Sequence, residues 1–249
     1  MAIIALAKEG QFLRPTAMIA LADQSIVVSD AATGELVRLD SLQLHARYSY
    51  PDQLREPVAL ASDGLSVHCL DRAGRQLVRL NQRLEIVETT LLPGVESRDW
   101  GVFLATTSFG ERILWERRRS ELVAIDLFGR ESWRVPVESD GELQALAASG
   151  EAIALLFAPA QGPRRILRMM RFGAQQRWIT LPDTVEAQTL CFAGDGNLLA
   201  ISPQAIWFSK PEACVIAAAF DSPIISAMAA RHGIAVLTQA GVRWMRWSF

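Results

Sequence analysis

The sequence predicts an all-β fold in which six similar four-stranded antiparallel sheets form a closed ring. Three observations support this prediction: a small apolar phrase that recurs six times, turn signals between short apolar runs, and an N-terminal apolar segment without a partner. The chain has 249 residues, of which 50% are hydrophobic and 21% are charged, so it can bury a substantial core. Length alone does not fix the number of domains, and we interpret residues 1–249 as a single domain.

The first strand of each repeat is predicted by a phrase rich in alanine. Its copies are IALAD (19–23), VALAS (58–62), VFLAT (102–106), QALAA (144–148), TLCFAG (189–194) and SAMAA (226–230). They are spaced by roughly 36 to 46 residues, a period typical of propeller blades. Small side chains suit strands that converge on the axis of a ring.

A turn and a second apolar run follow each first strand. These segments are SDGLSVHCL (62–70), SGEAIALLF (149–157), GDGNLLAIS (194–202) and RHGIAVLT (231–238). Glycine, and Asp-Gly in two of them, is a hairpin signal because glycine tolerates positive φ. We therefore expect the first and second strands of a repeat to pair directly.

Third and fourth strands complete each repeat. The third strands are expected at ELVRLD (35–40), QLVRLN (76–81), ELVAID (121–126), RILRMM (165–170), AIWFS (205–209) and VRWMRW (242–247). The fourth strands are expected at LHARYSY (44–50), EIVETTLL (85–92), ESWRVPV (131–137), RWITLP (177–182) and ACVIAAAF (213–220). The sixth repeat has no fourth strand of its own.

The segment AIIALA (2–7) precedes the first repeat and can supply that missing strand. This pairing would close the ring and remove exposed sheet edges. The prediction is a six-bladed β-propeller with four-stranded antiparallel blades, closed by the N-terminal strand. A helical or α/β solenoid is the competing interpretation, since QALAASGEAIALLFA could be helical. Apolar runs of only four to eight residues, interrupted by glycine and proline, favour strands.

The period, strand count and turns resemble the WD-repeat and NHL-type β-propeller superfamily over the full length. No blade ends in Trp-Asp and no Gly-His precedes a first strand, so no specific family motif matches. The resemblance implies a platform for other proteins, with enzymes as a minority. Function depends on sites placed on the fold, so the fold does not choose between these roles.

Composition excludes several classes of function. The net charge of −2 argues against a nucleic-acid partner. Three widely separated cysteines are typical of a reducing compartment. We find neither a secretory leader nor an apolar segment of roughly 18 to 20 residues, so we predict a cytoplasmic protein without membrane contact.

Catalytic motifs are sparse. The histidines are His45, His68 and His232, and we expect them to lie apart in the ring as ordinary strand and turn residues. No Gly-x-Ser-x-Gly elbow, clustered metal-ligand spacing or phosphate loop is present. We therefore predict no catalytic residue, metal or cofactor. An alternative remains open, because six-bladed lactonase-like enzymes bind a divalent cation through carboxylates and asparagine at the channel mouth. That resemblance implies a hydrolase or lactonase.

The junctions between a fourth strand and the next first strand carry mostly acidic residues. They are Asp52, Glu56, Glu96, Asp99, Glu138, Asp140, Glu142, Asp183, Glu186 and Asp221. Only Arg55 and Arg98 oppose them. In a propeller these junctions share one face near the channel, so we predict an acidic mouth that attracts a protein with a basic loop or tip. Polar turns that merely stay solvated are the competing explanation.

Three arginines and two tyrosines complete the predicted partner-binding surface. Arg117, Arg118 and Arg119 lie between a second and a third strand, at the rim of the same face, where a solvated hairpin tip flanked by Glu116 and Glu121 is the competing explanation. Tyr48 and Tyr50 share one side of a fourth strand, where tyrosine is often an interaction hot spot, and core packing at the blade edge is the alternative. The predicted function is a non-catalytic scaffold in a larger assembly. Cytoplasmic bacterial propellers sometimes work beside a MoxR-type ATPase and a von Willebrand A-type protein, which is a candidate context.

Overall fold

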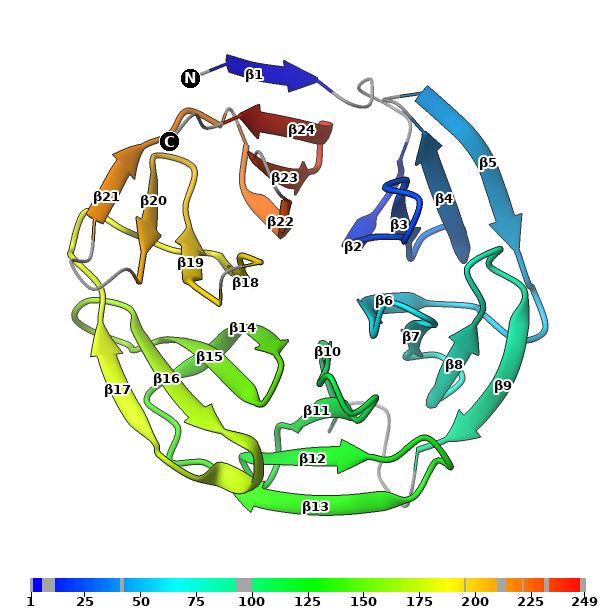
Figure 1. Ribbon diagram of the computed structural model, residues 1–249, viewed down its shortest axis with the longest axis horizontal. Helices are drawn as coiled ribbons and strands as arrows, with labels where there is room; N and C mark the ends of the chain where they lie inside the picture. Colours follow the sequence, from blue (N-terminus) through cyan, green and yellow to red (C-terminus); the bar gives the residue numbers. More distant parts are fainter. Residues whose placement is uncertain are drawn as a thin grey trace.

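Six four-stranded antiparallel sheets surround a central axis in the computed structural model (Figure 1), which confirms the predicted fold class. The structure describes residues 2–5, 12–40, 43–92, 100–194, 196–209, 214–220, 222–230 and 233–246. Within them, the single helical element is the short 3-10 turn η1 (Arg171–Gly173). None of the described helical segments has the length and apolar character that a membrane crossing requires.

Each blade runs outward from the channel in chain order. The first strands are β2 (Pro15–Ala20), β6 (Pro57–Ser62), β10 (Trp100–Thr106), β14 (Glu142–Ser149), β18 (Thr189–Phe192) and β22 (Ile224–Ala230). The second strands are β3 (Ile26–Asp30), β7 (Val67–Asp71), β11 (Arg112–Glu116), β15 (Ala152–Ala158), β19 (Leu198–Ile201) and β23 (Gly233–Thr238). The third strands are β4 (Glu35–Asp40), β8 (Gln76–Leu80), β12 (Glu121–Ile125), β16 (Arg165–Met170), β20 (Ala205–Phe208) and β24 (Gly241–Arg246). The outer strands are β5 (Gln43–Ser49), β9 (Ile86–Leu91), β13 (Glu131–Pro136), β17 (Arg177–Thr180), β21 (Cys214–Ala217) and β1 (Ala2–Ala5).

The first strand of blade 1 begins earlier than the sequence predicted. The expected segment was 19–23, whereas β2 ends at Ala20. The chain already reverses at this point, because the Asp23 carboxylate accepts hydrogen bonds from the backbone N–H and the hydroxyl of Ser25. Gln24 adopts a positive φ of 67° in the same turn. The repeated phrase therefore marks the end of this strand rather than its centre.

The N-terminal strand closes the ring, as predicted. β1 pairs antiparallel with β24, in a register that runs from Ala2 opposite Arg246 to Ala5 opposite Arg243. It becomes the outer strand of the blade formed by β22, β23 and β24. In Figure 1 it lies at the periphery, outside β24.

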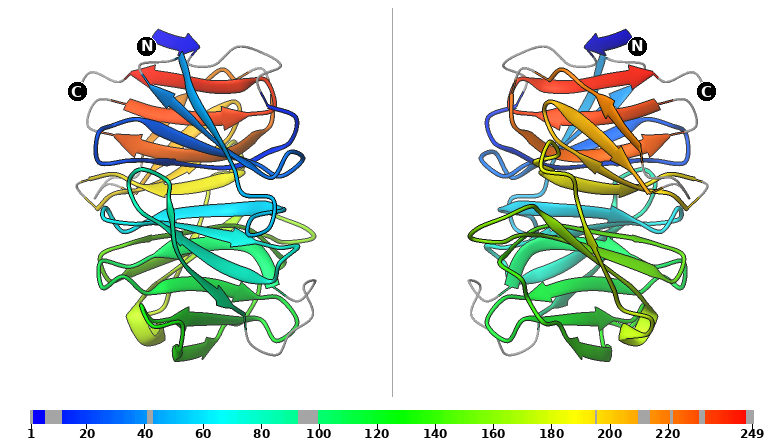
Figure 2. Two further views of the ribbon diagram at one scale, coloured as in Figure 1. Left: turned by 90° about the vertical axis from the view of Figure 1, so that its right-hand side faces the viewer. Right: turned by 90° about the vertical axis from the view of Figure 1, so that its left-hand side faces the viewer.

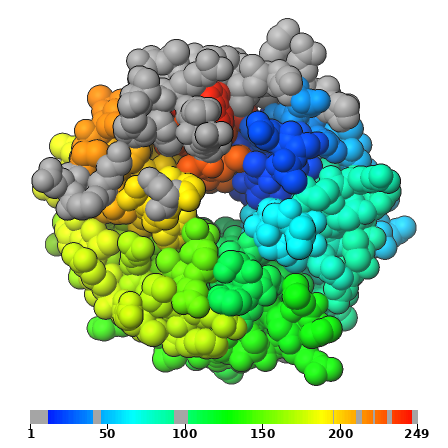
Figure 3. Space-filling view, in the orientation of Figure 1, coloured from blue at the N-terminus to red at the C-terminus, as the bar shows by residue number. Residues whose placement is uncertain are grey.

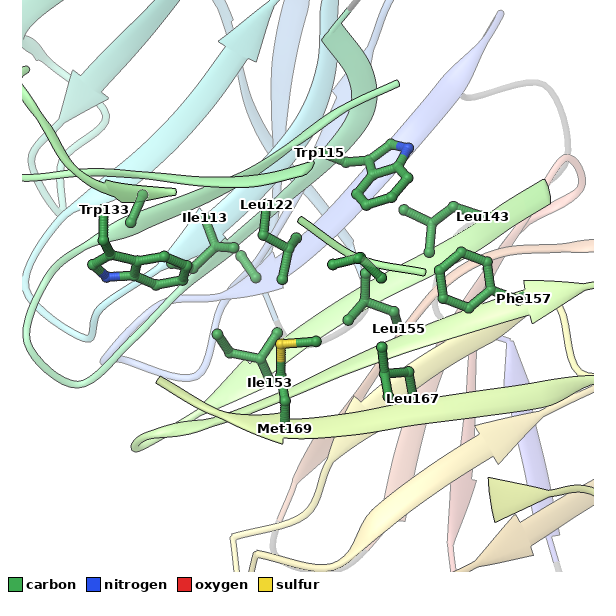
Figure 4. Close-up of a cluster of buried hydrophobic side chains, with 13 residues drawn as sticks. Ile113, Trp115, Leu122, Trp133, Leu143, Ile153, Leu155, Phe157, Leu167 and Met169 are labelled. Carbon is green, nitrogen blue, oxygen red and sulfur yellow. The ribbon is translucent and has the colours of Figure 1, made fainter. Parts of the chain in front are cut away.

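The core is distributed between neighbouring blades. Between blades 3 and 4, the ring of Phe157 packs edge-on against Trp115, with their centroids 6.2 Å apart, and lies tilted against Trp178 at 5.6 Å. Figure 4 shows the buried residues of this cluster, among which Leu122 and Leu155 are fully buried. Burial of each such side chain stabilises the fold by about 1.5–3 kcal/mol.

The connections divide between the two faces of the disc. The junction face carries the links from outer strands to the next first strands and those from second to third strands. Backbone hydrogen bonds join these two sets, including Arg72 N–H to Glu56 O at 3.0 Å and Leu181 N–H to Arg164 O at 3.0 Å. The hairpin face carries the remaining turns. Figure 2 shows the connections gathered at the two ends of the blades.

Candidate functional site

The central channel is a cavity of about 780 Å³ lined by the first strands. Its opening lies at the centre of the ring in Figure 3. Small side chains from the repeated phrases form much of the wall. They include Ala17, Ala59, Ala61, Ala105, Ala145 and Ala147. The alanine-rich phrases therefore line the channel, as the ring geometry requires.

Register shifts near the start of the first strands direct further side chains into the channel. In β2 the shift falls between Pro15 and Ala17, and in β14 it falls between Leu143 and Ala145. Thr16 and Gln144 are the residues at these shifts that have no partner in the register, and both line the cavity. A bulge re-aims a side chain without ending the strand.

Arginines and amides supply polar groups to the channel lining. Arg14, Arg72 and Arg164 line it, and Gln144, Gln188 and Gln239 add amide groups. The part of the lining that the structure describes contains no carboxylate and no histidine. Across the described residues, no group of three or more Asp, Glu, His or Cys side chains is arranged to hold a metal ion.

Glu56, one of the predicted acidic residues, is paired with two arginines. Its carboxylate accepts a 2.8 Å hydrogen bond from Arg14. It also accepts hydrogen bonds from both Nε and Nη2 of Arg72. The hydrogen bond from Arg72 is the main reason that the pKa of Glu56 lies below its ordinary value. This carboxylate is therefore committed to holding the loops of blades 1 and 2 together.

Asp140 is also paired, whereas several other predicted carboxylates are exposed. The Asp140 carboxylate lies 2.6 Å from Arg165 Nη1, and the Arg165 guanidinium stacks on the ring of Trp178 at 4.6 Å. The exposed acidic residues on this face that form no ion pair with described residues are Asp52, Glu138, Glu142, Asp183 and Glu186. Glu96, Asp99 and Asp221 lie outside the described residues.

A second cavity, of about 330 Å³, brings two of the predicted carboxylates together. Asp183 and Glu186 line it beside Arg164, whose Nη1 is buried without a hydrogen-bond partner. Its other walls include Pro159, Gly162, Pro163 and Pro182. Three prolines restrict the backbone of these walls.

The three rim arginines are exposed in the turn between β11 and β12, as predicted. Arg119 comes within 3.9 Å of the buried Glu116 carboxylate. The stronger partner of Glu116 is Arg134, at 2.9 Å. The side chains of Arg117 and Arg118 form no ion pair with a described residue.

The predicted tyrosines pack between blades. Tyr48 and Tyr50 are half-buried against the apolar cluster that includes Leu54 and Leu84. The Tyr50 hydroxyl donates a hydrogen bond to the backbone carbonyl of Leu84. Burial raises the pKa of Tyr50 above its ordinary value.

Two buried aspartates were not identified from the sequence. Asp30 accepts bonds from the backbone N–H groups of Leu13 at 2.7 Å and Arg14 at 3.0 Å. Asp71 accepts equivalent bonds from Arg55 at 3.3 Å and Glu56 at 2.7 Å. Both aspartates lie at the end of a second strand, a few residues before the repeated third strand. An alignment of SDAATGE with LDRAGRQ places the two aspartates at the same position and would have revealed them.

His68 is buried in β7, which is a second strand as expected from the segment 62–70. Its Nε2 lies 3.1 Å from the Asp63 carboxylate, and its Nδ1 has no partner. Burial is the main reason that the pKa of His68 lies below its ordinary value. Only the backbone of His45 is described, and His232 lies outside the described residues.

Comparison with solved structures supports the fold at low sequence identity. A gluconolactonase from Xanthomonas campestris superposes with a TM-score of 0.70 and 11% identity, covering 98% of this chain and 89% of that one. Virginiamycin B lyase from Staphylococcus aureus gives 0.65 and 12%, covering 100% and 88%. The WD40 repeats of RRP9 give 0.66 and 12%, covering 99% and 79%. Neither a protein-family model nor a curated protein sequence matches the chain.

The six-bladed β-propeller of this chain therefore resembles both WD40 proteins and propeller enzymes in its backbone. At 11–12% identity these similarities show the fold and assign no activity to the chain.

Proposed function

We propose that this chain is a non-catalytic protein-interaction platform that binds its partner through the junction face. The observation that carries the proposal is the 330 Å³ cavity beside the channel, where Asp183 and Glu186 are exposed on proline-restricted walls. A basic side chain of a partner would meet these two carboxylates there, beside the Arg164 guanidinium that also lines the cavity. Exposed Asp52 and Glu142 extend the negative charge around the same face.

The partner that this surface fits is a protein with a basic loop or tip. Such a partner would be drawn in by the exposed carboxylates and oriented by the Arg117–Arg119 turn at the rim. Our proposal includes a cytoplasmic setting and a single-domain chain. A MoxR-type ATPase with a von Willebrand A-type protein remains the candidate assembly.

Charge reversal at the cavity tests the proposal. Tagged chain is purified from its native cells, and the proteins that accompany it are identified by mass spectrometry. We expect the Asp183→Lys/Glu186→Lys variant to lose its partner while melting at an unchanged temperature. Glu85→Lys is the matched control, because Glu85 is an exposed acid on the hairpin face whose side chain bonds Asn81. A partner retained by the double variant would exclude this face.

The alternative function is a hydrolase or lactonase that uses the channel. A cavity of about 780 Å³ falls within the size range of small-molecule sites, which favours a small ligand there. Metal analysis of the purified chain discriminates between the two. A stoichiometric divalent cation, with a melting temperature that falls on chelation, would favour the enzyme over the platform.

A further inference from the structure

A group of large apolar side chains is exposed on the hairpin face of blades 3 and 4. Phe109 is 50% exposed in the turn between β10 and β11, and Phe172 is 59% exposed in η1. Leu127 and Phe128 are 46% and 79% exposed in the turn between β12 and β13. Contacts link Phe109, Phe172 and Leu127 to Arg171 or its neighbours, and Phe128 follows Leu127 in the same turn. These five residues are here called the aromatic cluster. It lies on the opposite face from the acidic cavity.

Arg171 joins the two phenyl rings of the aromatic cluster. Its guanidinium carbon lies 4.6 Å from the centre of the Phe109 ring and 4.3 Å from that of Phe172. The two rings come from adjacent blades, so the cation bridges the gap between them. Leu127 continues the surface, because its side chain packs against Gly110, the residue that follows Phe109. A Cβ placed on Gly110 would lie only 2.9 Å from the Leu127 side chain.

A buried carboxylate fixes Arg171 in this position. Glu111 accepts bonds from Arg171 Nε at 2.7 Å and from Nη2 at 2.6 Å. The same carboxylate accepts bonds from the indole N–H of Trp133 at 3.1 Å and from the hydroxyl of Ser132 at 3.2 Å. Glu111 is buried and its oxygens are occupied, so an incoming molecule meets the arginine and not the acid.

The backbone holds Phe172 outward in an unfavourable conformation. Phe172 has a φ of 60° and a ψ of 19°, the left-handed region that bulky residues rarely adopt. Its ring contacts Trp133 edge-on, with centroids 5.8 Å apart. Leu84 adopts a similar positive φ of 64° in the equivalent turn of blade 2 but is fully buried, whereas the Phe172 ring is exposed.

The hydrogen-bonding groups that remain select the chemistry of the ligand. Arg171 Nη1 makes no hydrogen bond with a described residue, so it can donate to a carboxylate. Exposed Arg130 and Arg177 lie in or next to the turns that carry Phe128 and Phe172. Glu151 is an exposed acid whose backbone carbonyl bonds Arg171. In the turn that carries Phe128, the Asp126 carboxylate accepts the backbone N–H groups of Phe128 and Arg130, and Glu131 beside it pairs with Arg134. Arg130, Arg171 and Arg177 therefore supply cations to a surface on which Asp126 and Glu131 are already hydrogen-bonded.

We propose that the aromatic cluster is a second docking surface, and that its ligand is a protein segment in which a carboxylate adjoins a bulky apolar side chain. The apolar side chain covers the phenyl rings while the carboxylate reaches Arg171 Nη1. Aromatic residues and arginine on a rigid support are the typical composition of binding hot spots. This proposal is independent of the acidic cavity on the junction face.

Selection from a displayed library of random 12-residue peptides on the immobilised full chain tests the proposal. We expect enriched peptides that combine Asp or Glu with Phe, Leu or Trp. A labelled consensus peptide, followed by fluorescence anisotropy, should bind at least about tenfold more weakly to Phe109→Ser/Phe128→Ser. Its Gln-for-Glu counterpart should also bind more weakly to the unaltered chain. Leu13→Ser is the matched control, since Leu13 is 72% exposed just before β2 in blade 1 and lies outside the cluster.

Each other outcome overturns the proposal. No enrichment, or enriched peptides without a carboxylate, would remove the stated ligand. Binding unchanged in Phe109→Ser/Phe128→Ser would place the site elsewhere. If the unaltered chain forms dimers in sedimentation experiments and that variant does not, the surface binds a second copy of the chain. If the unaltered chain binds phosphatidylserine vesicles and that variant does not, the surface binds a membrane. The Asp183→Lys/Glu186→Lys variant should keep full peptide affinity, which separates this proposal from the proposed function.

Discussion

The carboxylate of Asp71 accepts a 2.7 Å hydrogen bond from the backbone N–H of Glu56, which fastens the junction before blade 2 to the end of β7. The same carboxylate accepts bonds from Gly74 N–H at 3.2 Å and from the Gln76 amide at 3.0 Å. Asp71 is fully buried. One side chain thus organises both loops of the junction face in this blade.

Replacing Asp71 by alanine should destabilise the protein. The substitution removes the acceptor of three partly buried backbone N–H groups and of the buried Gln76 amide, which we expect to lower the free energy of unfolding by about 3 kcal/mol. Urea denaturation measures the effect. Asp52→Ala, an exposed acid in the same junction, should change stability by no more than about 0.5 kcal/mol. Equal losses in both variants would contradict this role for Asp71.

His68 should make stability depend on pH between neutrality and mild acid. Burial lowers the pKa of His68, while Asp63 opposes this shift and Arg112 and Arg79 reinforce it. The unfolded chain therefore binds a proton first as pH falls below about 6.5, so stability is full above that pH and declines below it. Urea midpoints from pH 7.5 to 5.5 should fall less steeply in His68→Gln.

The three cysteines should differ in reactivity. Burial raises the pKa of the Cys191 thiol to about 12 and that of Cys69 well above its ordinary value, whereas Cys214 is partly exposed. A thiol reacts as its thiolate, so only Cys214 should react rapidly with Ellman's reagent in the folded protein. Cys214→Ser should abolish the rapid phase. Rapid reaction of a second thiol in native buffer would show that β7, which carries Cys69, or β18, which carries Cys191, opens in the folded protein.

Removing residues 2–5 should weaken ring closure. The deletion exposes the edge of β24 that β1 covers, so we expect a lower melting temperature and association that increases with protein concentration. Calorimetry and analytical ultracentrifugation measure the two effects. A variant that stays monomeric with an unchanged melting temperature would show that closure depends on blade packing alone.

The strands were predictable because each has a local signal. ELVRLD and RILRMM coincide with β4 and β16, since apolar alternation and flanking turns define both ends of these strands. The first strand of blade 1 was misplaced because the alanine phrase there extends from the end of the strand into the following turn. There the Asp23 side chain, rather than glycine, reverses the chain.

The charge pairs were not predictable, because they join segments far apart in the sequence. Arg14 meets Glu56 across two blades, and Arg171 meets Glu111 across two others. Acidic residues could be assigned to the junction face from strand order alone. Which of them are neutralised depends on the three-dimensional path of arginine side chains, and no periodicity encodes that path.

The pairing of β1 with β24 gives the fold an order of assembly. During translation β1 emerges long before the strand that it pairs with, and it must stay unpaired while the intervening blades are made. Contacts between such distant segments form late, because the loop between them costs entropy to close. A nascent ring is therefore an open arc with an unpaired strand at its leading end, available to chaperones until β24 leaves the ribosome.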